Sequence, residues 1–230
     1  MSLLEPIVPT VLSVRRLPAA DPALLLAYGA DPARHTSLGL VTVDQDDPTY
    51  VALDEATKHA RVDVVFARSF YAGSAHASGR LSGEILGVLA AADPDEIEHG
   101  LEALLRCLAH DACFYKADAG GTVTVFPHVI ASLGHYLSAE AGLAAGEAMA
   151  YLVAPPIEAT VALDAALKAA DVRAQKVFPP PTETNFAAAW LSGSLPACQA
   201  AAEAYAEAVV RVAAEPLQRW GLHPQTPRRR

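Results

Sequence analysis

The segment Val51-Ala52-Leu53-Asp54 recurs 110 residues later as Val161-Ala162-Leu163-Asp164. A second match, Leu81-Ser82-Gly83 with Leu191-Ser192-Gly193, has the same spacing. Further identities follow the first segment in the same frame, pairing Ala56, Lys58, Ala60 and Val62 with Ala166, Lys168, Ala170 and Val172. Because two separate segments match in one ungapped frame, the chain is interpreted as an internal duplication.

The duplication divides the 230-residue chain into two units, each the size of a small domain. We predict a first domain over residues 1–115, a second domain over residues 116–220 and a flexible tail over residues 221–230. The tail prediction rests on two prolines followed by three terminal arginines, a composition typical of a solvated chain end.

Both units have the same order of expected elements. In the first unit we expect strands at 38–43, 62–66 and 85–89, a short helix at 54–60 and a longer helix that starts at Asp93-Pro94. In the second unit we expect strands at 151–154 and 172–178 and helices at 162–170 and near 198–213. Additional strand-like segments lie at 11–17 and 122–130. Strands followed by helices that cover one sheet face indicate an α+β unit.

Composition excludes several classes of protein. The formal net charge of -9 argues against a nucleic-acid partner, because phosphate binding relies on clustered Lys and Arg. No stretch approaches the roughly 20 consecutive apolar residues of a membrane span, and the first residues lack the pattern of a signal peptide. Three cysteines without metal-type spacing indicate reduced thiols and a cytoplasmic protein.

Several longer motifs resemble one family in collinear order from about residue 7 to residue 219. They are Ser37-Leu38-Gly39-Leu40, Asp46-Asp47-Pro48-Thr49-Tyr50, Asp54-Glu55-Ala56-Thr57-Lys58, Arg68-Ser69-Phe70-Tyr71-Ala72-Gly73, Met149-Ala150-Tyr151-Leu152-Val153-Ala154-Pro155-Pro156 and Pro179-Pro180-Pro181-Thr182-Glu183-Thr184-Asn185. The motifs are similar to those of the EutL family, the ethanolamine-utilisation shell proteins of bacterial microcompartments. The chain departs from the family pattern at Gly146-Glu147-Ala148, where a Gly-Asp-Pro turn is usual.

The resemblance implies two tandem, circularly permuted BMC domains of ferredoxin-like βαβ type. It also implies a pseudo-hexameric homotrimer that tiles with other shell proteins and is not an enzyme. The duplication agrees, because two units in each of three chains give six similar units around an axis. The resemblance also implies transport through a gated central pore and three smaller pores, one in each subunit.

The resemblance further implies an ethanolamine site. Asp46, Asp47 and Glu84 match family positions that contact ethanolamine, and carboxylates accept charge-assisted hydrogen bonds from an ammonium group. Phe114, Thr184, Asn185 and Phe186 match positions close to the ligand. The residues alone leave simpler interpretations open: Asp44, Asp46 and Asp47 also fit a solvated turn, and Phe114 fits core packing.

Two loops at equal positions in the repeats, 68–79 and 178–185, are the expected pore gate. Their candidate gating residues are Ser69, Phe70, Tyr71 and Gly73 in the first loop and Pro180, Pro181 and Thr182 in the second. Glycine gives the first loop conformational freedom, whereas consecutive prolines make the second stiff. Ordinary surface loops are the alternative.

No cofactor is expected. Glu158 matches a family position that can hold zinc, but one carboxylate does not define a zinc site. Neither a dinucleotide-binding nor a phosphate-binding glycine motif is present. The alternatives to a shell protein for ethanolamine are a non-catalytic amine sensor, a small enzyme acting on an amino alcohol, and a shell protein of a different diol or amine microcompartment.

Overall fold

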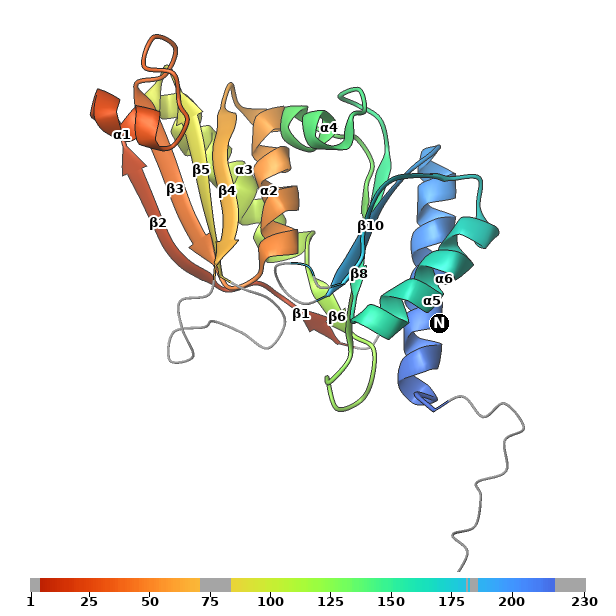
Figure 1. Cartoon of the computed structure of the whole chain (residues 1–230). Coiled ribbons are helices and arrows are strands. Elements are labelled where there is room, and N and C mark those ends of the chain that lie inside the picture. The colour runs from red at the N-terminus through yellow and green to blue at the C-terminus, as the bar shows by residue number, and fades with distance from the viewer. Residues whose placement is uncertain (1–4, 71–83, 181, 183–185, 218–230) are drawn as a thin grey trace, which may run out of the picture.

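The computed structural model describes residues 5–70, 84–180, 182 and 186–217 (Figure 1). In the first half of the chain the elements are β2 (Val11–Leu17), α1 (Pro22–Ala27), β3 (Ser37–Val43), α2 (Asp46–His59), β4 (Asp63–Phe70), β5 (Glu84–Ala91) and α3 (Pro94–His110). In the second half they are β6 (Phe114–Lys116), β7 (Thr124–Ile130), α4 (His135–Ala141), β8 (Met149–Ala154), α5 (Pro156–Ala169), β9 (Arg173–Phe178), β10 (Ala187–Ser192) and α6 (Leu195–Ala214).

The predicted duplication is confirmed by the order of the strands. The first sheet runs β2-β3-β5-β4, and the second contains the equivalent series β7-β8-β10-β9. Even an irregularity is repeated, because the pairing skips Val65 in β4 and Gln175 in β9, two residues at the same place in the repeat. Among the described residues, the strand pairs of both sheets are antiparallel, and each half packs two long helices on one face of its sheet.

The ungapped frame does not extend beyond β4, so the second sequence match was wrong as a repeat. Arg68 pairs with Leu86, and its counterpart Phe178 pairs with Ala188. The paired strands β5 and β10 are therefore 102 residues apart, not 110. Leu191 and Ser192 belong to β10, whereas residues 81–83 lie outside the described residues. Ser194 is the counterpart of Asp93, since each caps the helix that follows.

Two expected helices are longer than their sequence patterns suggested. α2 starts at Asp46 rather than Asp54, and α5 starts at Pro156 rather than Ala162. Pro48 and Pro156 do not interrupt these helices because the first turn needs no backbone N–H from them. The short helices α1 and α4 and strand β10 were not predicted. β10 begins with three alanines, which have low β-propensity.

The N-terminal strand β1 (Pro6–Ile7) pairs with β6, which makes the second sheet six-stranded. The N-terminal segment thus contributes to the sheet of the second half. The domain boundary expected after residue 115 falls inside β6.

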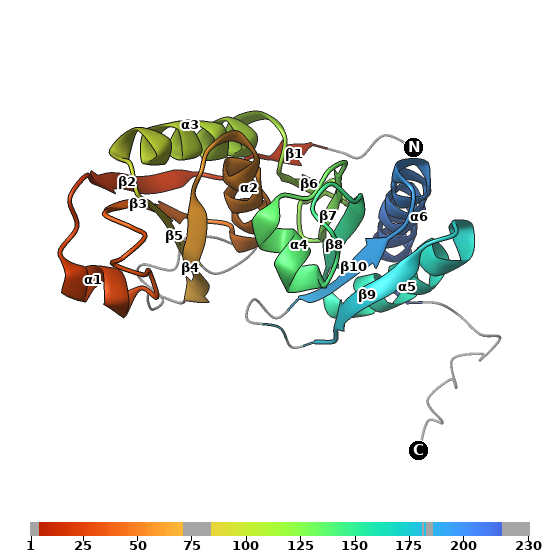
Figure 2. The same cartoon turned by 90° about the horizontal axis from the view of Figure 1, so that it is seen from above.

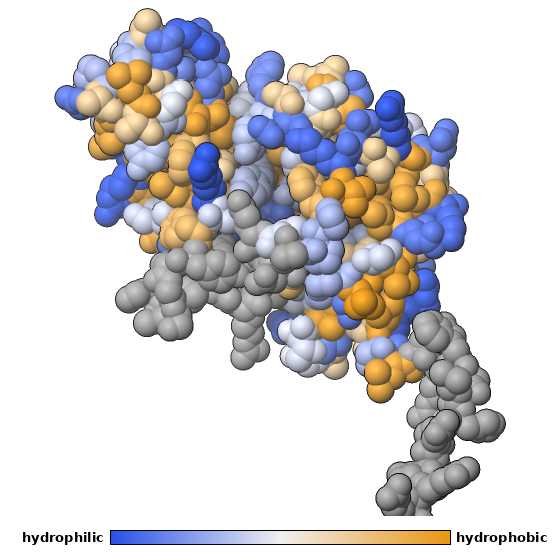
Figure 3. Space-filling model, viewed as in Figure 1, coloured by the Kyte–Doolittle hydropathy of each residue, from blue (hydrophilic) through white to orange (hydrophobic). Residues whose placement is uncertain are grey.

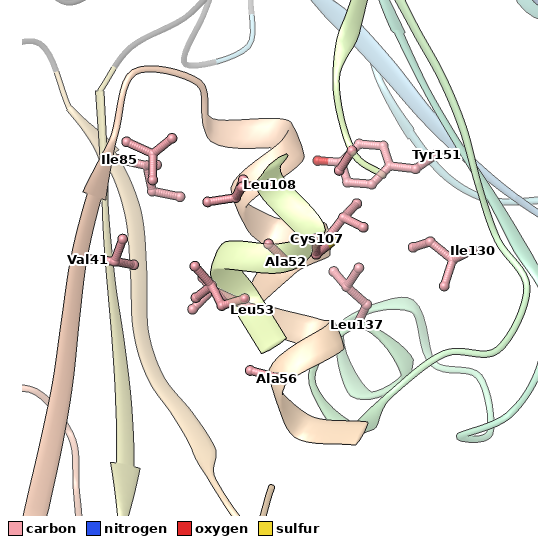
Figure 4. Packing of buried hydrophobic residues seen from close by; sticks show 14 of the residues in the cluster. Val41, Ala52, Leu53, Ala56, Ile85, Cys107, Leu108, Ile130, Leu137 and Tyr151 are labelled. Atoms are coloured by element: carbon pink, nitrogen blue, oxygen red, sulfur yellow. The ribbon is translucent and has the colours of Figure 1, made fainter. Parts of the chain in front are cut away.

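The layers alternate along the molecule as sheet, helices, sheet, helices (Figures 1 and 2). α2 and α3 lie between the two sheets, while α5 and α6 cover the far face of the second sheet. Ala52, Leu53 and Ala56 of α2 sit between Val41 and Ile85 of the first sheet and Leu137 and Tyr151 of the second half (Figure 4). The largest cluster of buried residues therefore spans both halves.

The buried carboxylate of Asp54 forms hydrogen bonds between the first and second halves of the chain. Asp54 of α2 accepts hydrogen bonds from the backbone N–H groups of Gly134, at 2.7 Å, and Leu137, at 2.8 Å. Thr57 Oγ1 accepts a third from His135 N. α4 begins without a cap from its own segment, so α2 supplies it. Burial raises the pKa of Asp54 above its usual value, although both backbone donors lower it. Its repeat counterpart Asp164 is exposed and pairs with Lys168.

Replacing Asp54 and Asp164 one at a time compares the buried cap with the exposed ion pair at the same position of the repeat. We expect Asp54→Ala to lower the free energy of unfolding by about 2–4 kcal/mol, because two buried N–H donors lose a charged acceptor. Asp164→Ala is the matched control and should cost less than about 0.5 kcal/mol, as an exposed ion pair does. Urea unfolding followed by circular dichroism measures both values. Equal losses would contradict the capping role.

Candidate functional site

A cavity of about 680 Å³ lies between the two halves. Residues of α2 and β4 line one side, α4 closes one end, and β8, β9 and β10 form the opposite wall. In Figure 3, hydrophilic residues follow part of the junction between the halves. The lining residues are Asp46, Asp47, Tyr50, Ala67, Tyr136, Leu137, Glu140, Tyr151, Val153, Lys176, Val177, Phe178, Pro179, Thr182, Ala188 and Trp190.

Two carboxylates form the acidic wall. Asp46 and Asp47 occupy the first turn of α2 and are only 4% and 7% exposed, so they do not form a solvated turn. Ser69 Oγ donates to Asp46, and the Asp47 backbone N–H donates to the other oxygen of Asp46 at 2.9 Å. The positive end of the helix dipole stabilises both negative charges at this place.

A hydrogen bond joins the acidic wall to the second half. Tyr151 of β8 donates its hydroxyl to Asp47 Oδ1 at 2.6 Å, between residues that lie more than 100 positions apart in sequence. Burial and the neighbouring Asp47 carboxylate raise the pKa of Tyr151 well above its ordinary value. Tyr151 therefore stays protonated and acts as a fixed donor to Asp47.

Aromatic side chains form the opposite wall. Trp190 of β10 lies between Tyr151, at a ring-centroid distance of 5.4 Å, and Phe178, at 5.2 Å. Phe126 continues the row on the other side of Tyr151 at 5.6 Å. Sequence reasoning missed Tyr151 and Trp190 as site residues. Their position as aromatic residues within the apolar runs 149–154 and 187–191 was available as a signal, but the register that places them opposite each other was not.

The remaining predicted site residues are spread more widely. Glu84 opens β5 opposite Phe70, beside the Ser69 that bonds Asp46, but it does not line the cavity described above. Phe114 is fully buried against Phe126, with Phe186 edge-on at 6.3 Å, so this structure supports its packing role; its ligand contact stays a prediction.

The predicted gate is only partly described. Thr182 lines the cavity, and Pro180 lines a smaller hollow of about 170 Å³ behind β9. Tyr71, Gly73, Pro181, Thr184 and Asn185 lie outside the described residues, so nothing tests their predicted roles.

Glu158 lies in the first turn of α5. Across the described ranges, no three His, Cys, Asp or Glu side chains come together as a metal site. Within the same ranges, no helix combines the length and apolarity needed to cross a membrane.

Known proteins share this architecture over nearly the whole chain. The BMC domain model matches residues 37–110, from β3 to the end of α3. The bacterial microcompartment shell protein EutL of Clostridium perfringens is 51% identical over 209 residues, which cover 91% of this chain and 96% of the relative. The chain belongs to the EutL family of bacterial microcompartment shell proteins.

Solved structures extend this conclusion to the fold. A crystal structure of EutL from C. perfringens matches with a TM-score of 0.87 and 50% identity over 94% of this chain and 98% of that chain. The trimeric shell protein PduB, only 19% identical, shares the fold with a TM-score of 0.74 over 89% of each chain. The two repeats of this EutL-family chain are thus tandem permuted BMC domains, and the protein is a component of a microcompartment shell.

The hydrogen bond between Tyr151 and Asp47 contributes measurably to the stability of the protein. We expect Tyr151→Phe to lower the free energy of unfolding by about 1.5–3 kcal/mol, because a buried carboxylate loses a donor. Tyr28→Phe is the control, since Tyr28 packs edge-on against Phe66 of the first half and lies away from the cavity. Its loss should stay below about 0.5 kcal/mol. Urea titration checks both, and an unchanged Tyr151→Phe midpoint would refute the assignment.

Proposed function

We propose that three copies of this chain close into a shell tile, and that the cavity between the halves of each subunit is a pore that binds ethanolamine. The observation that carries the ligand assignment is the pair of buried carboxylates, Asp46 and Asp47, facing aromatic rings across this cavity. The tile does not catalyse a reaction in this proposal, and its function is to hold the layer together and pass small molecules.

The comparison of α2 with α5 supports the ring. Within the chain, α2 buries Asp47, Val51, Asp54 and Thr57 against the second half. The residues at the same positions of α5, Ile157, Val161, Asp164 and Leu167, are all exposed. Ile157 is 67% exposed and Val161 is 46% exposed, which is unusual for apolar residues on one helix face. Hydrophobic residues are visible over this side of the second half in Figure 3.

A receiving surface is present at the other end of the molecule. α4 receives α2 through the buried Leu137, whereas the equivalent residue of α1, Leu24, is 36% exposed. α1 and α4 correspond because each lies between the first two strands of its four-strand series and is followed by a glycine with positive φ, Gly29 and Gly142. The α5 face of one chain can therefore dock on the α1 side of the next, as α2 docks on α4. Such head-to-tail contacts form rings when the rotation closes.

The chemistry of the cavity suits a small amino alcohol. An ammonium group about 4 Å from one carboxylate gains roughly 4 kcal/mol at an effective dielectric constant near 20, before desolvation is subtracted. The aromatic faces add attraction for the same cation. Weak, reversible binding of this kind is what a pore needs, because the ligand must also leave. Glu84 and the segments around Ser69 and Pro180–Thr182 belong to this proposal as a further ligand contact and as the gate.

The ring contact can be broken at a single helix face. We expect Ile157→Glu together with Val161→Glu to convert the assembled protein to single chains, because two charges are placed in an apolar contact. Leu217→Glu is the control, as Leu217 is 82% exposed and lies beyond α6. Light scattering after size exclusion gives the masses. A double variant that keeps the mass of three chains would exclude α5 from the interface.

The ligand assignment has its own test. We expect the triple variant Asp46→Asn, Asp47→Asn and Glu84→Gln to lose ethanolamine binding in calorimetry, while its mass in solution stays that of the parent. Asp44→Asn is the matched control, because Asp44 bonds Thr10 N at 2.6 Å and does not line the cavity. Binding retained by the triple variant would refute the ethanolamine site.

A further inference from the structure

The aromatic wall of the cavity already holds an ammonium group that belongs to the protein. The Nζ atom of Lys176 lies 5.1 Å from the centre of the Trp190 ring and 3.7 Å from Glu140 Oε2. A cation over an indole face with a carboxylate beside it is the arrangement by which proteins recognise ammonium ions. Lys176 thus occupies a cation site inside a cavity lined by acids and aromatic rings.

The strand register builds this site. Lys176 in β9 is paired directly with Trp190 in β10, so both side chains stand on the same face of the sheet. Glu140 reaches it from α4 on the other side of the cavity. The first repeat has nothing similar, because Phe66 and Val88 occupy the positions of Lys176 and Trp190. The site is therefore a feature of the second repeat alone.

The lysine is held loosely enough to leave. Its side chain is 39% exposed and that of Glu140 is 54% exposed, so water screens their attraction. The Trp190 ring, in contrast, is fixed between Tyr151 and Phe178 and is 6% exposed. Its Nε1–H is buried without an acceptor among the described residues. The fixed parts would remain in place when Lys176 moves away.

We propose that Trp190 and Glu140 form a second ammonium subsite, and that Lys176 fills it as a tethered competitor until a small primary amine displaces it. This inference rests on the proposed amine-binding function of the same cavity. A tethered group acts at an effective concentration in the millimolar range, so a free amine must exceed that range to enter the subsite. Lys176 thereby keeps the affinity of the cavity for a free amine low. At low amine concentration the subsite then holds Lys176 and no bound amine.

The test is Lys176→Met, which keeps an unbranched apolar side chain and removes the charge. In calorimetry with ethanolamine we expect the affinity to rise about tenfold, within the range of a cation–π contact plus a carboxylate. Lys116→Met is the matched control, because Lys116 lies on β6, pairs with Glu5 and does not line the cavity. It should leave the affinity unchanged. Lys176→Arg, which keeps the cation, should bind ethanolamine as weakly as the parent.

A double variant separates the subsite from a general change of charge. Adding Trp190→Leu to Lys176→Met should abolish the gain, whereas a purely long-range effect of charge would leave it in place and overturn the subsite. If Lys176→Met binds ethanolamine as well as the parent or more weakly, the competitor role of Lys176 is refuted, while the proposed binding of ethanolamine in the cavity is not. If neither the parent nor Lys176→Met binds ethanolamine, the proposed amine-binding function and the competitor role of Lys176 are both refuted. Binding by Lys176→Met alone supports the competitor.

Discussion

The structure depends on the burial of α2 on two sides. One face of this helix completes the core of the first sheet, and the other face is covered by α4 and by β8 of the second half. Polar atoms at two levels of the helix are bonded across the junction, Asp47 in its first turn to Tyr151 and Asp54 near its middle to the start of α4. Because buried polar groups require partners, these bonds fix the position and rotation of the second half relative to the first. The cavity exists because the two halves are held in this arrangement.

The two repeats have kept the same fold and have diverged in what their equivalent residues contact. The four residues of the Val-Ala-Leu-Asp motif are identical in both copies, yet Asp54 is a buried cap and Asp164 is an exposed partner of Lys168. The same holds for Val51, which is buried, and Val161, which is exposed. The same motif thus forms a buried interface on α2 and an exposed face on α5. This asymmetry is what a subunit needs if the contact within a chain is repeated between chains.

The junction between the repeats is also where the chemical groups of the cavity meet. Carboxylates come from the helix of the first repeat, aromatic rings from the sheet of the second, and Glu140 from the short helix α4. Neither repeat alone contains the set. A site at such a junction responds to small shifts between the halves, so the residues that hold the halves together also set the distance between the acidic and aromatic walls.

The sequence by itself determined the duplication, the α+β class and the family, and it singled out Asp46 and Asp47, which line the cavity. Helix α3 could be read from its apolar stripe and its Asp93-Pro94 start, because those signals are local. The sequence could not give the repeat spacing after β4, where it changes from 110 to 102 residues. Equivalent residues there are defined by strand pairing, and the connecting segments differ in length. The residues alone left a solvated turn open for Asp46 and Asp47, because nothing local reveals that α2 begins at Asp46, eight residues before the expected helix start at Asp54. Only the tertiary structure decided that Tyr151, Trp190 and Lys176 line the same cavity as Asp46 and Asp47, because cross-strand register and the docking of α2 bring together groups that are about 100 residues apart.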